Sequence, residues 1–168
     1  INFAKDGRIT YYLNEFSVKK GDVFLIKPGM IHAIGKNMTV AEIGTNCNIT
    51  YRLYDYKRKD KNGCERPLHL AQAAAAARTN MEKICGFDAN GELLCGKFAV
   101  KYVKIHRETK FNAQKDSCHC IMLTFGKGSI KCGGENLEVK AGDSVFIPAG
   151  AGEYSVCGNC EILSTRVI

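Results

Sequence analysis

One histidine stands where a metal ligand is expected. His32 lies three residues after Gly29 in the segment KPGMIHAIG (27–35), which follows an apolar run. Neutral imidazole is a good ligand for Zn²⁺, and a turn at the rim of a β-barrel can direct it inward. The alternative is a hydrogen-bonded core histidine. One histidine cannot hold a metal ion alone, so we expect further ligands elsewhere.

Two charged residues extend this candidate site. Glu42 stands between apolar neighbours in VAEIG, which favours a rim position or a functional carboxylate. The alternative is a structural ion pair, for example with Arg52. Arg52 lies on a predicted strand, 49–55, whose alternation turns it toward a barrel interior. Burying an arginine there is costly unless it meets an anion; the alternative is a surface arginine paired with Asp55.

His69 and His106 are weaker candidates for a functional role. His69 leads into an alanine-rich segment, where an interdomain hydrogen bond is the better interpretation, and His106 lies in a charged stretch typical of a surface. Asp55, Tyr51 and Tyr54 are expected to be structural.

Composition limits the partners. The 168 residues suffice for one large or two small domains, and 45% are hydrophobic, which is ample for a core. No apolar run reaches the roughly 18 residues of a membrane span. The net charge is +7, but the basic run 57–61 alternates with aspartates, as in a solvated turn. We expect no nucleic-acid or membrane partner; a basic chain suits a phosphorylated small molecule.

The chain has nine cysteines. An odd count without a visible secretory signal favours reduced thiols and a cytoplasmic protein. The CxxC of Cys157 and Cys160 with the CxC of Cys118 and Cys120 suggests structural zinc. On a strand, however, Cys118 and Cys120 share one face while His119 points the other way. We therefore expect free thiols that pack as small hydrophobic residues.

Short strands separated by glycine turns dominate the chain, which predicts an all-β sandwich or barrel. The exception is LAQAAAAARTN (70–80), where consecutive alanines predict a helix. The first residues, Ile-Asn-Phe, resemble the cut edge of a strand, so we expect a piece of a longer protein. The predicted strands are 8–13, 22–27, 38–43, 49–55, 97–105, 119–125, 128–132, 136–139, 143–147, 153–157 and 160–167.

The sequence contains an internal repeat. GDVFLIKPGMIH (21–32) aligns without gaps on GDSVFIPAGAGE (142–153), so Gly21, Asp22 and Gly29 recur 121 residues later. This offset of one domain length predicts two copies of one β domain. Glu153 takes the position of His32 in the second copy.

These spacings resemble the second cupin motif, in which glycines and a proline precede a metal-binding histidine. Gly21, Gly29 and His32 fit it, although Lys27 stands at the usual proline position. In the second copy Gly142 and Pro148 fit, but the ligand is missing. The resemblance implies double-stranded β-helix jelly rolls that enclose a metal.

A narrower resemblance covers nearly the whole chain. PGMIHAIG, AEIGTNCNITYRLYDYKR and NGCERPLHLAQA occur in this order, and together they look like type I mannose-6-phosphate isomerase of the short bacterial kind. The second β segment is similar to the C-terminal domain of that family. The resemblance implies residues 1–56 as the end of an incomplete catalytic cupin, 57–92 as a linker with a helix, and 93–168 as a second, metal-free cupin.

The resemblance also implies the chemistry. The family interconverts mannose 6-phosphate and fructose 6-phosphate, with one zinc ion per full-length chain. His32 matches a zinc ligand, and the remaining ligands precede Ile1. Arg52 matches an active-site arginine that holds substrate oxygens or stabilises an enediolate. Glu42 matches a carboxylate proposed to carry the proton between C2 and C1. The fragment alone is expected to be inactive.

Several positions depart from the family pattern. Met30 replaces a small residue, and Gly44 and Thr45 replace glutamines that help line the family's site. These changes favour two alternatives: a divergent isomerase, or a bicupin that binds a sugar phosphate without converting it. A third is a structural fragment that completes a partner chain.

In the second copy Asn112, Gln114, His119 and Glu153 fall near ligand positions, but a metal-free barrel is expected.

Overall fold

A computed structural model of the chain describes residue 4, residues 6–78 and residues 84–168. The chain divides into two compact units, Ile1–Cys85 and Gly86–Ile168. Among the described residues, no helix combines the length and the apolar surface needed to cross a membrane. The domain boundaries expected after residues 56 and 92 stay a prediction.

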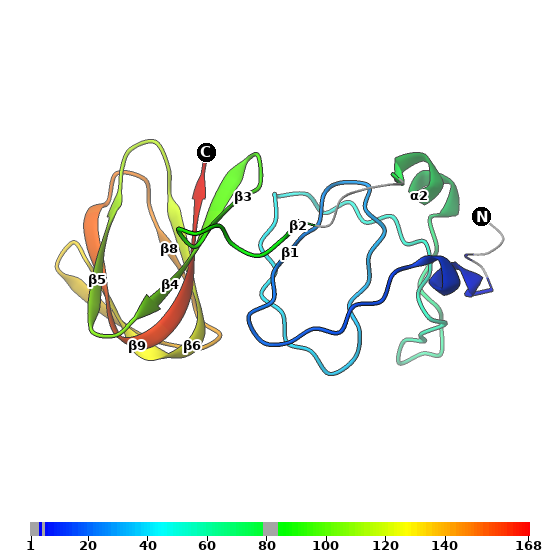
Figure 1. Ribbon diagram of the computed structural model, residues 1–168, viewed down its shortest axis with the longest axis horizontal. Helices are drawn as coiled ribbons and strands as arrows, with labels where there is room; N and C mark the ends of the chain where they lie inside the picture. Colours follow the sequence, from blue (N-terminus) through cyan, green and yellow to red (C-terminus); the bar gives the residue numbers. More distant parts are fainter. Residues whose placement is uncertain (1–3, 5, 79–83) are drawn as a thin grey trace. The chain divides into compact units, whose positions relative to one another are not determined.

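Antiparallel strands build the second unit. One seven-stranded sheet has the order β3-β4-β9-β6-β7, with β5 added to β9 and β8 added to β6. In Figure 1 these strands curl around a shared interior. The strand bounds are β3 Glu92–Leu94, β4 Phe98–Ile105, β5 Glu108–Ala113, β6 His119–Cys132, β7 Glu135–Lys140, β8 Ser144–Ile147 and β9 Gly152–Val167.

The pairing of β6 with β9 is the longest in the sheet. It runs from His119 opposite Arg166 to Cys132 opposite Tyr154, with an irregularity between Leu123 and Phe125. The two strands approach each other very closely where Gly128 faces Gly158. A Cβ atom on Gly128 would overlap the carbonyl oxygen of Cys157, so only glycine permits this approach.

Alternation along the strands places one apolar face inside the sheet. The inward side chains are almost wholly inaccessible to water, so their burial supplies most of the favourable free energy of this unit. The core consists of Ile105, Ala113, Ile121, Leu123, Ile130, Val139, Ile147, Tyr154, Val156, Cys160 and Ile162.

One polar pair lies at this core. The hydroxyl of Tyr154 and Nδ1 of His119 are 2.8 Å apart. Burial raises the pKa of the Tyr154 hydroxyl to about 12 and, together with nearby Arg166, lowers the pKa of His119. Both groups therefore stay neutral near neutral pH, as burial in an apolar interior requires.

The predicted strands of the second unit are confirmed, with three differences, the first of which is that the short strand β3 was not predicted. The predicted pairs 119–125 with 128–132 and 153–157 with 160–167 each form one continuous bent strand, β6 and β9. Strand β5 was not predicted, because its charged residues suggest surface. Its signal is the alternation of Thr109, Phe111 and Ala113, which are more buried, with exposed neighbours.

The first unit contains little regular structure. Its elements are the 3₁₀ helix η1, Arg8–Tyr12, the strands β1, Phe24–Leu25, and β2, Ile84–Cys85, and the helix α2, Leu70–Ala76. Strand 22–27 is confirmed only at β1, and the predicted strands 8–13, 38–43 and 49–55 are wrong. A strand exists only where a neighbour completes its hydrogen bonds, and local propensity cannot supply that neighbour.

Helix α2 ends earlier than predicted. Consecutive alanines favour a helix over 70–80, but Ala77 is already extended. The backbone N–H of Arg78 donates to the carbonyl of Gly29 at 2.9 Å, so a tertiary contact captures the chain there. The end of the predicted helix, residues 79–80, lies outside the described residues.

The sequence repeat folds into the same turns in both units. Gly21 and Gly142 each adopt a positive φ, and the carboxylates of Asp22 and Asp143 each accept a backbone N–H from the residue three positions earlier, at 3.0 and 2.9 Å. A turn also follows eight residues after each leading glycine, with Gly29 and Gly150 at positive φ. The structure therefore confirms the repeat at the level of these turns.

Removing core volume from β9 should destabilise the second unit. Ile162 is completely buried, so Ile162→Ala is expected to lower the free energy of unfolding by about 2–5 kcal/mol. Ile168→Ala makes the same change at a side chain 52% exposed, and should stay within about 0.5 kcal/mol. Urea unfolding followed by circular dichroism measures both. Equal effects of the two substitutions would contradict the assigned core.

Candidate functional site

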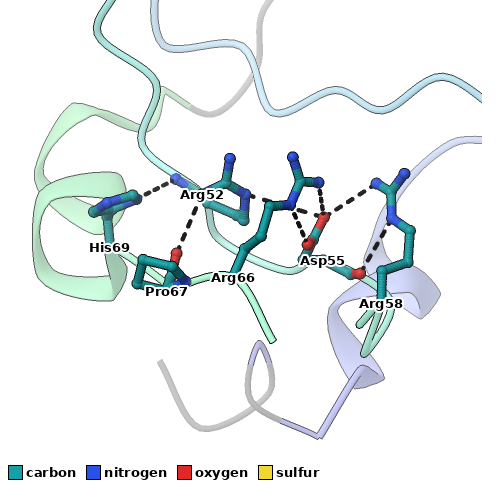
Figure 2. Close-up of polar contacts among 6 residues, drawn as sticks. All are labelled: Arg52, Asp55, Arg58, Arg66, Pro67 and His69. Atoms are coloured by element: carbon teal, nitrogen blue, oxygen red, sulfur yellow. Dashed lines mark hydrogen bonds and ion pairs between the residues drawn. The ribbon is translucent and has the colours of Figure 1, made fainter. Parts of the chain in front are cut away.

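A buried carboxylate surrounded by arginines organises a loop of the first unit (Figure 2). The side chain of Asp55 accepts hydrogen bonds from Arg66, from Nε at 2.8 Å and from a terminal guanidinium nitrogen at 2.5 Å. Arg58 donates to the same carboxylate at 3.1 Å. Nε of Arg52 lies 4.0 Å from it. We call these four residues the Asp55 cluster.

The environment keeps Asp55 ionised. Asp55 is only 6% exposed, which by itself would favour the neutral acid. The hydrogen bonds from Arg66, with the charges of Arg66, Arg58 and Arg52, outweigh that burial and lower the pKa of Asp55. Three guanidinium groups around one carboxylate leave a surplus of two positive charges.

The backbone fixes Arg52 in this cluster. Its N–H donates to Nδ1 of His69 at 3.0 Å, and the N–H of His69 donates back to the Arg52 carbonyl at 2.8 Å. Its guanidinium also donates to the carbonyl of Pro67 at 3.2 Å. Arg52 is therefore partly buried and oriented, but by a loop rather than by the predicted strand 49–55.

His69 is hydrogen-bonded to Arg52 in both directions. Its hydrogen bonds lie within the first unit, where it is the residue just before α2, and they tie the start of that helix to residue 52. Nδ1 accepts a proton-bearing N–H, so it is the unprotonated nitrogen of the ring. The interdomain hydrogen bond expected for His69 stays a prediction.

His32 is oriented as a ligand would be. Nδ1 lies 2.9 Å from the carbonyl of Met30, and a carbonyl only accepts, so Nδ1 carries the proton. Nε2 therefore has a free lone pair on an exposed side chain. A backbone carbonyl that holds the other ring N–H is the usual support of a metal-binding histidine.

Glu42 is not a member of the Asp55 cluster. Its side chain is exposed, and within the described part of the chain no ion pair joins it to Arg52. The charge of Arg52 faces Asp55 instead, which was the alternative partner expected from the sequence. The structure brings Arg52 to Asp55, and a common site of His32, Glu42 and Arg52 stays a prediction.

The residues present do not make a complete zinc site. No group of three or more histidine, cysteine or acidic side chains converges among residues 4, 6–78 and 84–168. Zinc takes four ligands in structural sites and three protein ligands in catalytic ones. His32 fits one of these positions, and the described residues do not place two further ligands of these types beside it.

In the second unit, the residues near cupin ligand positions are engaged elsewhere. His119 contacts the Tyr154 hydroxyl, and Glu153 pairs with Lys110 at 3.1 Å. The backbone carbonyl of Gln114 accepts the N–H of Gly150 at 2.8 Å, a contact that leaves its side chain unassigned. The sequence predicts that this unit holds no metal, and that expectation stays a prediction.

Sequence reasoning did not single out the centre of the Asp55 cluster. Asp55 was expected to be structural, and Arg66 was not considered, because nothing in sequence spacing indicates contact across eleven residues. The hollow beside them, also lined by Tyr54 and Leu68, measures about 30 Å³. That is room for about one water molecule, so the cluster as it stands orders the loop rather than enclosing a sugar.

The second unit carries the identifying match. Residues 93–167 match the family model described as the mannose-6-phosphate isomerase cupin domain, so this all-β unit is a cupin domain. The crystal structure of the mannose 6-phosphate isomerase from Bacillus subtilis superposes with a TM-score of 0.59 at 27% identity. That superposition covers 71% of this chain and 41% of that one.

Curated relatives extend the match to nearly the whole chain. Mannose-6-phosphate isomerase ManA of Bacillus subtilis is 31% identical over 164 residues, 92% of this chain and 52% of the relative. The mannose-6-phosphate isomerase of Streptococcus mutans is 28% identical over 93% of this chain and 52% of its own length. The chain is similar to mannose-6-phosphate isomerases along nearly its whole length, and it spans about half the length of these relatives.

The Asp55 cluster should make the stability of the first unit depend on pH. Because the pKa of Asp55 is lowered in the folded chain, its contribution is present above the ordinary value of 3.8 and is lost as the pH falls through the lower folded value. Asp55→Asn should lower the thermal midpoint by several degrees at neutral pH and flatten its acid dependence. The near-ultraviolet circular dichroism of the tyrosines reports the transition.

Asp60→Asn is the matched control. The Asp60 carboxylate accepts only the backbone N–H groups of Asn62 and Cys64, which an asparagine oxygen also accepts. This variant should keep the midpoint and its acid dependence. An unchanged midpoint in Asp55→Asn would show that the cluster contributes nothing to stability.

Proposed function

We propose that this chain is roughly the C-terminal half of a mannose-6-phosphate isomerase, which interconverts mannose 6-phosphate and fructose 6-phosphate. The observation that carries the proposal is the 31% identity to an isomerase of that name along 92% of this chain. The surplus positive charge of the Asp55 cluster supports a phosphorylated substrate, because guanidinium groups bind phosphate and sugar oxygens well.

The first unit is proposed to be the incomplete part of the catalytic cupin, so that the protein contains two jelly rolls joined by the helical segment. The repeated turns support this, since both units use the same geometry at equivalent positions. Exposed apolar side chains also support it, because a chain this apolar normally buries them. Of the described hydrophobic residues in this unit, only Ala4 and Ala73 are buried; the exposed ones include Tyr11, Ile31, Ile34, Met38, Val40, Ile49 and Tyr51.

The proposed reaction moves one proton and one pair of electrons within the sugar. A base takes the proton from C2 of the open-chain aldose, which leaves a cis-enediol, and the same base returns the proton to C1 of the ketose while a hydroxyl proton passes from O2 to O1. Glu42 is the proposed base, since its carboxylate is exposed and makes no ion pair with the described residues. Arg52 is proposed to hold substrate oxygens where negative charge develops.

The proposal includes a zinc ion, for which this chain supplies one ligand. His32 offers Nε2, and a complete site needs ligands from the half of the family's length that this chain does not span. The changes at Met30, Gly44 and Thr45 bear on which sugar phosphate is preferred. A cytoplasmic location, expected from the odd number of cysteines, also stays a prediction.

The decisive measurement is isomerase activity of the full-length protein that contains this chain. We expect it to convert mannose 6-phosphate in a zinc-dependent way and His32→Ala to abolish the conversion. His106→Ala is the matched control, because His106 is an exposed histidine of the other unit and should leave the rate unchanged. Atomic absorption on the purified variants separates lost metal from lost folding.

Two further variants test the proposed roles. Glu42→Gln removes the base but keeps the shape, and should lower kcat by about 10²–10⁴-fold. Arg52→Lys keeps the charge but loses the planar fork, and should lower kcat by about 10²–10³-fold. A folded, zinc-loaded protein without turnover that still binds mannose 6-phosphate would replace the isomerase assignment with the sugar-phosphate-binding bicupin.

A further inference from the structure

The second unit contains two cysteine motifs, whose side chains occupy different positions relative to the faces of the sheet. Cys157 and Cys160, the CxxC motif on β9, lie on opposite sides of the strand. The thiol of Cys157 donates to the carboxylate of Glu108, 3.7 Å away, whereas Cys160 is buried in the core. Two sulfur atoms separated by the sheet cannot join without breaking it. The motif most typical of redox chemistry is therefore not a redox pair here.

The CxC motif at the start of β6 has the opposite geometry. Cys118 immediately precedes β6, and Cys120 is its second residue. Side chains two residues apart on an extended chain lie on one side of it, and the neighbouring Cys118 thiol contributes, after burial, to raising the pKa of the Cys120 thiol. His119, between them, points to the other side and contacts Tyr154.

The reach of the backbone permits a bond. Two residues of a strand span about 6.6 Å, and the Cα atoms of a disulfide lie about 4.4–6.8 Å apart, so a fully extended pair is near the upper limit. Cys118 lies outside the ladder, whose pairing begins with His119 opposite Ile147 and Arg166. The backbone at 118 can therefore shorten this distance without removing a paired residue.

We propose that Cys118 and Cys120 form a reversible intramolecular disulfide, which makes the beginning of β6 a site of oxidative modification. Cys120 is exposed and Cys118 is partly exposed, so a small oxidant reaches the pair from solvent. The class of oxidant is a low-molecular-weight disulfide such as oxidised glutathione, or a peroxide.

With oxidised glutathione the atoms balance in two exchanges. The Cys120 thiolate attacks one glutathione sulfur, which forms a mixed disulfide and releases one glutathione thiolate. The Cys118 thiolate then attacks the sulfur of Cys120, forms the new bond and releases the second glutathione thiolate. The two electrons lost by the protein pair reduce the glutathione disulfide, and the two thiol protons end on the released glutathione molecules.

The environment of the Cys120 thiol determines the rate of this exchange. Burial and the neighbouring sulfur of Cys118 raise the pKa of the Cys120 thiol, so little thiolate exists at neutral pH. The pair therefore reacts slowly compared with catalytic cysteines. Such a slowly reacting pair can accumulate an oxidative modification over time, but it is not suited to catalysing repeated redox cycles.

Mass spectrometry tests the proposal directly, because trypsin separates the two motifs. Cleavage after Lys115 and Lys127 leaves DSCHCIMLTFGK, residues 116–127, which contains Cys118 and Cys120 and no other cysteine. Cleavage after Lys140 and Arg166 leaves the CxxC motif in the separate peptide 141–166. The chain is treated with oxidised glutathione while folded, alkylated with iodoacetamide and digested without reductant.

The expected product is peptide 116–127 without alkylation, about 2 Da lighter than its reduced form because two hydrogens are lost, and restored by dithiothreitol. In the same digest, peptide 141–166 should not form an internal disulfide. Cys120→Ser should abolish the light peptide, whereas Cys157→Ser should leave it unchanged.

Three results would overturn the proposal. The first is a folded, oxidant-treated chain in which both Cys118 and Cys120 are still alkylated. The second is a disulfide that links peptide 116–127 to another peptide, and the third is an internal disulfide in 141–166 in place of the one in 116–127. A mutant that fails to fold does not decide the matter, because the wild-type digest compares both motifs within one molecule.

Discussion

The antiparallel pairing of β6 with β9 is the constraint on which the second unit depends. All but one of the other strand pairings of its sheet use one of these two strands, and the exception joins β3 to β4. Their length requires both strands to bend, and the contact between Gly128 and Gly158 allows the backbones to pass closely enough to do so. The alternation imposed by this pairing then decides which side chains form the core.

The first unit is held by other means. Where the second unit buries an apolar core, the described part of the first buries a carboxylate and pairs it with arginines. Such a cluster orders a loop because an ionised group taken out of water must find partners, and Arg66 and Arg58 supply them. The reciprocal hydrogen bonds between residues 52 and 69 extend this order to the start of α2. Polar contacts therefore position Arg52 where no sheet is available to do so.

The two faces of a sheet also explain how the cysteines divide. Residues two apart on a strand share a face, whereas residues three apart, such as Cys157 and Cys160 on β9, lie on opposite faces. The same rule separates His119 from its cysteine neighbours and turns it to Tyr154. Chemistry suggested by a motif therefore depends on the face that each residue occupies. The sheet favours the CxC pair and not the CxxC pair.

The sequence by itself determined the strands whose alternation is strong, the repeat of turn residues and the resemblance that placed His32, Glu42 and Arg52, because these signals are local. Glycine at a positive φ and an aspartate that caps its own turn need no distant partner, so the turns at Gly21 and Gly142 follow from a few neighbouring residues. Only the tertiary structure decided that 38–43 and 49–55 form no strands, that Gly29 ends α2, and that Asp55 gathers three arginines. Each of these outcomes depends on a hydrogen-bond partner far away in the sequence, and local propensity contains no information about that partner.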